Sequence, residues 1–541
     1  MNSANKVWLA GVLIALSVGL AAGAQAADAP TPVGPVDFDI VMKGGTIYPG
    51  DTGPFRGDVA ISGDRIVYVG PHAKGRAAKV IDAHRLIVAP GFIDPHTHAG
   101  DALASLDPAA RLVLPFLTQG VTTAFIGVDG GGKAEVAKTL GIGRAGDAKP
   151  DQGINFASYV GFGAIRSAVV GNADRAPTEA ELEQMQRLVG KAMCEGALGL
   201  STGLFYAPQS FAKRDEVVAL ARVAASKGGI YDSHIRDEAS YSIGLMGAVD
   251  ETLAIGREAG IPIHFAHIKA LGVDVQGLAP AVIARIEAAQ AEGLTVTADQ
   301  YPWSASGTRL SAALMPRWAQ DGGREAMLGR MNDPVARGKM RPEIVDNLRR
   351  RGGAAAILIT SGPGRFAGKT LQSIATELKV DPVDAALAVL QQDEVGIASF
   401  NQSEADIAAF MRRPWVVTSS DASEGHPRYY ASFARKYATY VQQRKVIDLR
   451  TFIAASTIRT ARMFGLDGRG ELKAGAFADV IAFDPVRFAP RADYARPNLF
   501  SAGMKHVIVN GQLAIENEAP TGAAAGRPLP RTPKPGSCPS Y

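Results

Sequence analysis

The sequence predicts an α/β protein whose main unit is a (β/α)8 TIM barrel. Short apolar runs of β type alternate with helical runs from about residue 85 onward, and eight such runs are present. Near-continuous apolar strands that alternate with helices are typical of a parallel sheet covered by helices, and a count of eight favours closure into a barrel. A doubly wound open sheet usually has fewer strands, and no GxGxxG motif directly follows one of the predicted strands.

The eight predicted strands follow one another with a helical pattern between most of them. In RDEVVALARVAASKG and LAPAVIARIEAAQAEG the apolar residues recur at i, i+3 and i+4, as on one face of a helix. The strands are RLIVAPGFIDPHTH, VTTAFIGVD, INFASYVGFG, ALGLSTGL, GGIYDSHI, PIHFAHIKA, LTVTADQYP and PWVVTSSDA.

Three further units are predicted around the barrel, which we place at residues 91–469. Residues 37–90 and 470–525 contain short alternating strands with glycine turns, so the two chain ends are expected to meet in one small β-sandwich domain. Residues 304–362 are too long for a simple connection and have helical patterns, which predicts an inserted helical subdomain over the barrel mouth, suited to act as a lid.

The N-terminus has the pattern of a signal peptide over residues 1–26. One lysine precedes the apolar run VWLAGVLIALSVGLAAGA, and AQA before Ala27 is a small-residue cleavage site. The alternative is a membrane anchor, but the run is of borderline length and the cleavage site favours removal. The sequence therefore predicts an exported, periplasmic protein with no membrane contact after cleavage, since no other stretch is long and apolar enough to span a bilayer.

Two cysteines and a weak net charge set further limits. Export permits a disulfide, but Cys194 lies in a helical pattern as a small apolar residue, and Cys538 lies in a Pro/Gly-rich segment, residues 526–541, predicted to be a flexible tail. Whether the two pair stays open. The net charge is +4 and no Lys/Arg cluster with interleaved aromatics is present, so nucleic acid is not an expected partner.

Six potential metal ligands fall at the ends of predicted strands. They are His96, His98, Asp129, His234, His267 and Asp421. Each has an ordinary explanation alone, because a single strand histidine is most often packed in a core and an aspartate often caps a helix. Five strands that deliver six such residues to the rim where barrel enzymes place their active sites instead indicate a metal site.

The motifs together resemble the D-aminoacylase (N-acyl-D-amino-acid deacylase) family of the amidohydrolase superfamily. The resemblance runs from about residue 38 to 525 and implies a metal-dependent barrel that hydrolyses the amide of N-acyl-D-amino acids. The motifs are GFIDPHTH, TQGVTTAFIGVDGGG, GALGLSTGLFY, YDSHIRDEA, FAHIKALG, TADQYPW, SSDASEGHPR and GELKAGAFADVIAFDP.

The resemblance also implies roles for single residues and a cofactor, one or two Zn²⁺ ions. His96 and His98 match the ligands of one metal position, and His234 and His267 those of a second. Asp421 matches a residue that is both ligand and catalytic base. The binders of the substrate carboxylate match Lys269, Tyr301 and Arg428, which implies a small-molecule substrate with a free carboxylate.

The chain departs from the family pattern at two places. The family typically has a cysteine after the second strand, where this chain has Asp129 in GVDG, so a hard carboxylate replaces a soft thiolate. After Tyr301 the chain reads YPWSASGT, and Gly307 lacks a hydroxyl that helps hold substrate. The fourth run, ALGLSTGL, has no lysine for the carboxylated bridge of hydantoinase-like relatives, which counts against that branch.

Three functions stay open at the level of sequence. The first is deacylation of N-acyl-D-amino acids, with Asp421 moving a proton between water and the leaving amine. The second is a dipeptidase that acts on dipeptides with a C-terminal D-residue, which breaks the same kind of amide. The third is a metal-poor barrel that serves as a binding protein because the cysteine is lost.

Overall fold

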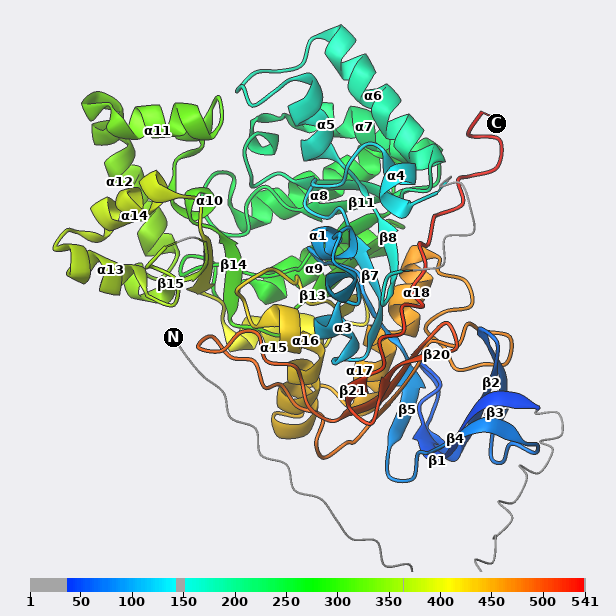
Figure 1. Cartoon of the computed structure of the whole chain (residues 1–541). Helices are drawn as coiled ribbons and strands as arrows, with labels where there is room; N and C mark the ends of the chain where they lie inside the picture. The colour runs from blue at the N-terminus through cyan, green and yellow to red at the C-terminus, as the bar shows by residue number, and fades with distance from the viewer. Residues whose placement is uncertain (1–36, 143–150, 363, 540–541) are drawn as a thin grey trace, which may run out of the picture.

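The computed structural model describes residues 37–142, 151–362 and 364–539 (Figure 1). The predicted signal peptide, residues 1–26, lies outside the described residues. Within the described ranges, no helix combines the length and the apolar character that crossing a bilayer requires.

Strands from both chain ends form one nine-stranded sheet, as the sequence predicts. The two halves join where β5 pairs antiparallel with β18, with Val88 opposite Ala482. The predicted sandwich is instead a single hydrogen-bonded sheet that branches at β1, which pairs with β2, β4 and β5. The strands are β1 (Phe38–Ile47), β2 (Phe55–Ser62), β3 (Arg65–Gly70), β4 (Ala77–Asp82), β5 (Ile87–Pro90), β18 (Val480–Phe483), β19 (Met504–Val509), β20 (Gln512–Glu516) and β21 (Ala519–Pro520).

The central strands are parallel and lie in two sheets, in the orders β6-β7-β8 and β17-β13-β12-β11-β10-β9. They correspond to the eight predicted runs, but the hydrogen bonding does not close them into one barrel. Tyr159 separates β8 from β9, and among the described residues an isolated parallel bridge, Thr97 to Ala422, is the one strand pairing between the outer edges. The strands are β6 (Phe92–Asp94), β7 (Val121–Ile126), β8 (Asn155–Ser158), β9 (Val160–Gly161), β10 (Gly199–Gly203), β11 (Ile230–His234), β12 (Ile263–Phe265), β13 (Val296–Gln300) and β17 (Val416–Thr418).

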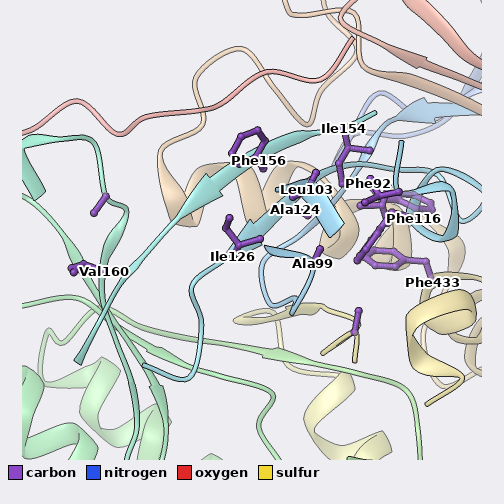
Figure 2. Packing of buried hydrophobic residues seen from close by; sticks show 14 of the residues in the cluster. Phe92, Ala99, Leu103, Phe116, Ala124, Ile126, Ile154, Phe156, Val160 and Phe433 are labelled. Carbon is purple, nitrogen blue, oxygen red and sulfur yellow. The ribbon is translucent and has the colours of Figure 1, made fainter. Parts of the chain in front are cut away.

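Amphipathic helices cover these strands. Helix α6 begins with a capping box, in which the Thr178 hydroxyl accepts from the Glu181 backbone and the Glu181 carboxylate accepts from that of Thr178. Figure 2 shows part of the core beneath, where the rings of Phe92 and Phe433 stack with centroids 5.3 Å apart. The longer helices are α5 (Phe162–Val169), α6 (Glu179–Cys194), α7 (Arg214–Ser226), α8 (Gly244–Ala259), α9 (Ala279–Ala291), α15 (Glu404–Met411), α16 (Arg428–Arg435), α17 (Leu449–Ser456) and α18 (Ile458–Phe464). Shorter helices are α1 (Gly100–Leu103), α2 (Pro108–Arg111), α3 (Leu114–Leu117) and α4 (Val136–Leu140), and a π-helix spans Lys436–Gln443.

The segment between β13 and β17 is longer than the predicted helical insertion at 304–362, and it contains a sheet. Strands β14, β16 and β15 pair antiparallel in that order, and helices pack on them around a separate apolar core. Figure 1 shows α11 to α14 grouped on the opposite side of the molecule from β1 to β4. The elements are β14 (Ala305–Arg309), α10 (Leu310–Leu314), α11 (Arg324–Asn332), α12 (Pro334–Arg350), β15 (Ile357–Ser361), α13 (Leu371–Leu378), α14 (Pro382–Gln392) and β16 (Gly396–Phe400).

The C-terminal segment is held in place, in contrast to the flexible tail predicted for 526–541. Cys538 forms a disulfide with Cys194 at the end of α6. The backbone amide of Leu529 donates to the carbonyl of Phe156 at 2.7 Å, and the amide of Arg531 donates to that of Gly196 at 2.9 Å. The flexible tail was predicted from the proline and glycine content of the segment. Backbone hydrogen bonds and the disulfide instead anchor its described part.

Removal of this disulfide is expected to destabilise the protein without changing its chemistry. Cys194 and Cys538 are 344 residues apart, and cross-links that close long loops typically stabilise by about 2–4 kcal/mol. The double variant Cys194→Ser/Cys538→Ser should therefore unfold at lower temperature in differential scanning calorimetry. Wild-type protein treated with reductant is the control and should match the variant. An unchanged unfolding temperature would contradict this role.

Candidate metal centre and substrate cavity

The six predicted ligands lie together at the carboxyl ends of the parallel strands. His96 and His98 follow β6, Asp129 follows β7, and His234 is the last residue of β11. His267 follows β12 and Asp421 follows β17. Parallel strands bring their carboxyl ends to one edge, so residues far apart in the sequence come to share one site.

Three of these residues have left-handed backbone conformations, which are uncommon outside glycine. The φ angles are 54° at Asp129, 34° at His267 and 49° at Asp421. Such conformations cost about 1–3 kcal/mol each and persist where surrounding contacts fix them. The Asp421 amide donates to the His96 carbonyl at 3.0 Å, and the His267 amide donates to Asp299 Oδ1 at 3.0 Å. With these backbone conformations, the side chains of Asp129, His267 and Asp421 all point into one cavity.

Asp129 lies between the two pairs of histidines. Its Oδ1 is 3.4 Å from His96 Nε2, 3.4 Å from His267 Nε2 and 3.7 Å from His234 Nδ1. Its Oδ2 is 3.6 Å from His98 Nε2. One carboxylate thus reaches both halves of the cluster, as a ligand that bridges two metal positions must.

Asp421 and Glu238 complete the two halves. Asp421 Oδ1 is 3.3 Å from His98 Nε2 and 3.9 Å from His96 Nε2. Glu238 Oε1 is 3.3 Å from His267 Nδ1, and Glu238 Oε2 is 3.7 Å from His234 Nε2. Sequence reasoning missed Glu238, although its place four residues after His234 in SHIRDE offered a signal.

The donor set fits divalent metal ions. His96 Nε2, Asp129 Oδ1 and His234 Nε2 are buried and have no hydrogen-bond partner among the described residues. Buried polar atoms without partners are costly unless something else binds them. Imidazole nitrogens and carboxylate oxygens in groups of three, with ligand atoms within 4.8 Å of one another, are the ligands that zinc prefers.

The pKa values of His234 and His267 are shifted in opposite directions. Burial lowers the pKa of His234 to about 4, which keeps this imidazole in the neutral form that binds metal. Burial and Lys269 lower the pKa of His267, but its carboxylate neighbours, Asp421 first among them, raise it to about 10.

Buried acidic residues below the cluster hold it in place, and sequence reasoning missed them. Asp94 Oδ1 accepts from the backbone amides of His96 at 3.3 Å and Ser420 at 3.0 Å. Asp299 Oδ2 is 3.0 Å from His264 Nε2, and its Oδ1 accepts from the His267 amide. The signal was present, since both aspartates lie in the quoted motifs GFIDPHTH and TADQYPW.

The three predicted carboxylate binders also lie beside the cluster. Arg428 Nη1 is 2.7 Å from Asp421 Oδ2, and Arg428 Nη2 donates to Ser423 Oγ at 2.9 Å. Lys269 Nζ bonds to Glu238 and lies 2.6 Å from His267 Nδ1. The Tyr301 ring lies between these cations, 5.2 Å from Arg428 Cζ and 5.6 Å from Lys269 Nζ.

Gly307 has a steric reason to be glycine. A Cβ at this position would lie 2.9 Å from Arg428 Cζ, closer than real Cβ contacts. Because Gly307 has no side chain, the Arg428 guanidinium can lie beside Asp421. The position that lacks a hydroxyl thus leaves space for this guanidinium.

The predicted metal ligands other than His96, together with Glu238 and the three predicted carboxylate binders, line one cavity of about 720 Å³. Its walls also include Phe205, Tyr206 and residues of β14. A volume of this size falls within the range of about 300–1,000 Å³ that is usual for small-molecule sites. The cavity thus joins a metal-binding cluster, a carboxylate and cationic groups in one space.

Comparison with known proteins agrees with this geometry. The Amidohydrolase family matches residues 150–515. A D-aminoacylase of Alcaligenes xylosoxydans xylosoxydans is 32% identical over 92% of this chain and 98% of its own. An N-acyl-D-glutamate deacylase of the same organism is 32% identical over 91% and 97%. The solved N-acyl-D-glutamate deacylase of Bordetella bronchiseptica, complexed with zinc and a phosphonate mimic of the tetrahedral intermediate, is 30% identical over 91% of this chain and 99% of its own, with a TM-score of 0.77.

Proposed function

The chain belongs to the D-aminoacylase family of amidohydrolases, and from this premise we propose that it hydrolyses the amide bond of N-acyl-D-amino acids. The products are a D-amino acid and a carboxylic acid. The observation that carries the proposal is the common cavity, in which Asp421 contacts both the histidine cluster and Arg428. A metal site, a proton acceptor and a carboxylate binder are thereby adjacent.

The histidine cluster fits one or two zinc ions. A bound divalent ion supplies Lewis-acid chemistry, since it lowers the pKa of water and polarises a carbonyl oxygen. The residues that would hold it are His96, His98, Asp129, His234, His267 and Asp421.

Asp421 is placed to move the proton. Burial raises the pKa of the Asp421 carboxyl, but Arg428 and then His267 lower it well below its usual value, so the group is an ionised acceptor at neutral pH. It accepts a proton from the attacking water and donates it to the leaving amine, which keeps the step balanced. The described residues offer no other carboxylate that contacts both His98 and Arg428.

Arg428, Lys269 and Tyr301 would hold the α-carboxylate of the substrate. A guanidinium offers a planar fork that matches a carboxylate with two parallel hydrogen bonds. Held there, beside the metal cluster, the carboxylate would fix which face of the α-carbon is presented to the cluster.

Arg428→Ala is expected to lower kcat/KM for an N-acetyl-D-amino acid by about 10- to 150-fold. A hydrogen bond to a charged group contributes about 1.5–3 kcal/mol, and 1.4 kcal/mol corresponds to about tenfold. Arg428→Lys should restore little, because lysine lacks the planar fork. The measurement is steady-state hydrolysis of N-acetyl-D-leucine.

A neutral carboxamide analogue of this substrate separates recognition from the loss of the ion pair with Asp421. Wild type should lose most of its efficiency on the carboxamide, and the variant should lose little more. If the variant discriminates acid from carboxamide as strongly as wild type, Arg428 does not bind the carboxylate.

A dipeptide with a C-terminal D-residue presents the same amide and carboxylate. The experiment that decides between the substrate classes is hydrolysis, with zinc supplied, of N-acyl-D-amino acids and X–D dipeptides that share one C-terminal residue. The rate of hydrolysis of the N-acyl-D-amino acids should exceed that of the dipeptides. Faster cleavage of the dipeptides would make the protein a dipeptidase.

We also propose a finer architecture than the hydrogen bonding gives. The two parallel sheets would together be the (β/α)8 barrel of residues 91–469, with β8 and β9 as one interrupted strand. The bridge from Thr97 to Ala422 supports closure between β6 and β17. A crystal structure would contradict this if those edges were separated by side chains or solvent.

Export to the periplasm is a further proposal, with residues 1–26 removed as a signal peptide. The Cys194–Cys538 disulfide supports it, because such bonds persist in oxidising compartments. Expression with the natural N-terminus, followed by cell fractionation and N-terminal sequencing, is the test. Recovery of full-length protein from the cytosol would contradict the proposal.

A further inference from the structure

Arg351 is a buried cation without an acidic partner. Its side chain follows the end of α12 and is 2% exposed. Its Nε donates to Tyr241 Oη at 2.6 Å and its Nη1 to Ser306 Oγ at 3.3 Å, and both partners are neutral. A buried charge is costly unless it is paired, so this arrangement needs an explanation.

The other buried arginines show how the protein normally treats such a charge. Arg166 pairs with Glu216 at 3.0 Å, Arg428 with Asp421 at 2.7 Å, and Arg469 with Asp479. Within the described ranges, Arg351 is the one arginine of this buried set that has no ion pair with a carboxylate.

Arg351 lines the substrate cavity, as Arg428 does. The ring of Phe205 connects it to the metal cluster, since the ring centroid is 5.9 Å from Arg351 Cζ and 5.8 Å from the centroid of His234. Ser306, which accepts from Arg351, directly precedes Gly307, whose backbone faces Arg428. Arg351 and Arg428 thus contact neighbouring residues of β14, Ser306 and Gly307, and both line the cavity.

A second buried donor lies beside Arg351 without a partner. Asn401 Oδ1 accepts from Ser306 Oγ at 3.2 Å, while Asn401 Nδ2 is buried with no hydrogen-bond partner among the described residues. The following residue, Gln402, donates to Tyr301 Oη at 2.9 Å. Arg351 and Asn401 thus meet at Ser306, and neither is paired with a carboxylate among the described residues.

We propose that Arg351 binds a second carboxylate on the substrate, so that the preferred substrates are N-acyl-D-amino acids with two carboxylates. The second carboxylate belongs either to the side chain of the D-residue or to the acyl group. This inference rests on the proposed deacylase function and names the substrate class of that same cavity. Bound substrate then supplies the anion that the protein itself does not place beside Arg351.

The test compares charged substrates with neutral isosteres in wild type and variants. The side-chain pair is N-acetyl-D-glutamate and N-acetyl-D-glutamine, and the acyl pair is N-succinyl-D-leucine and its terminal succinamide. We expect wild type to prefer the charged member of one pair by about tenfold or more in kcat/KM. Arg351→Met should remove that preference, and Arg351→Gln, which keeps polar contacts to Tyr241 and Ser306, should remove it too.

Arg309→Met is the matched control, because Arg309 is an exposed arginine at the rim of the same cavity. It removes the same unit of charge and should leave the preference intact. The ratio of the kcat/KM values for two substrates, measured on one enzyme sample, does not depend on the folded fraction. A partly destabilised Arg351 variant therefore still gives an answer.

The outcomes separate this inference from the proposed function. The inference is overturned if wild type shows no preference in either pair, if Arg351→Met keeps it, or if Arg309→Met removes it equally. If N-acetyl-D-leucine is nonetheless hydrolysed, the deacylase function stands and only the second carboxylate site is wrong. If wild type with zinc hydrolyses none of the substrates, the proposed function fails as well.

Discussion

Asp421→Asn is expected to lower kcat by about 10²- to 10⁴-fold, the usual contribution of a general base. Asparagine keeps the size of the side chain but cannot accept a proton from water at neutral pH. The geometry makes Asp421 hard to replace, because the same carboxylate lies 3.3 Å from His98 Nε2 and 2.7 Å from Arg428 Nη1. The measurement is single-turnover hydrolysis of N-acetyl-D-leucine with metal content determined in the same sample.

The variant should also lose stability, since Arg428 would remain buried without its anionic partner. Loss of one member of a buried ion pair typically destabilises by about 3–5 kcal/mol. Activity must therefore be expressed per folded, metal-loaded enzyme. Ser423→Ala is the control, because it removes a contact of Arg428 but leaves the proton acceptor in place. More than a tenth of wild-type kcat in Asp421→Asn, at unchanged metal content, would rule out this role.

Asp129→Ala is expected to lower metal affinity by tenfold or more. Loss of residues that only orient ligands typically costs about 10–100-fold in affinity, and Asp129 lies in the cluster itself, within 3.7 Å of four histidines. The measurement is metal content by mass spectrometry after equilibration against buffered free zinc. Asp129→Cys should shift the preference toward zinc, because thiolate is a softer ligand than carboxylate.

Asp129→Asn is the control for the backbone, which has a φ of 54° at this position. Asparagine tolerates the left-handed conformation better than alanine, so a loss of metal affinity in Asp129→Asn reports the loss of the carboxylate and not backbone strain. Full metal content and activity in both variants would contradict a bridging role and leave Asp129 a structural residue.

Much of the fold follows from periodicity and strand count. The runs that end in His98, His234 and Asp421 became strands because near-continuous apolar residues are buried on both faces of a parallel sheet. Strand β14, in contrast, has the small polar sequence ASGTR, and its place is set by pairing with β16 some ninety residues later. Such a long-range partner leaves no local signal, which is why the insertion was predicted to be helical.

Some residues of the site could likewise be predicted from the sequence and others could not. The ligands could be predicted because strand ends bring histidine and aspartate to one rim. The sequence offers only a spacing signal for Glu238 and none for Arg351, since their roles depend on what lies across the cavity: Glu238 bonds to Lys269, and Arg351 donates to Tyr241 and Ser306. The pairing of Cys194 with Cys538 could not be predicted either, because Cys538 is brought near Cys194 by the backbone pairing of the C-terminal segment with Phe156.

Metal-dependent, stereoselective hydrolysis in the cavity around Asp129 and Asp421 is the central activity proposed for the protein. The most direct measurement is the initial rate on N-acetyl-D-leucine and N-acetyl-L-leucine, with enzyme stripped of metal and then titrated with zinc. We expect no turnover without metal, recovery of activity at one or two equivalents of zinc, and strong preference for the D-enantiomer. Turnover that is independent of metal, or equal on both enantiomers, or absent with zinc bound, would contradict the account.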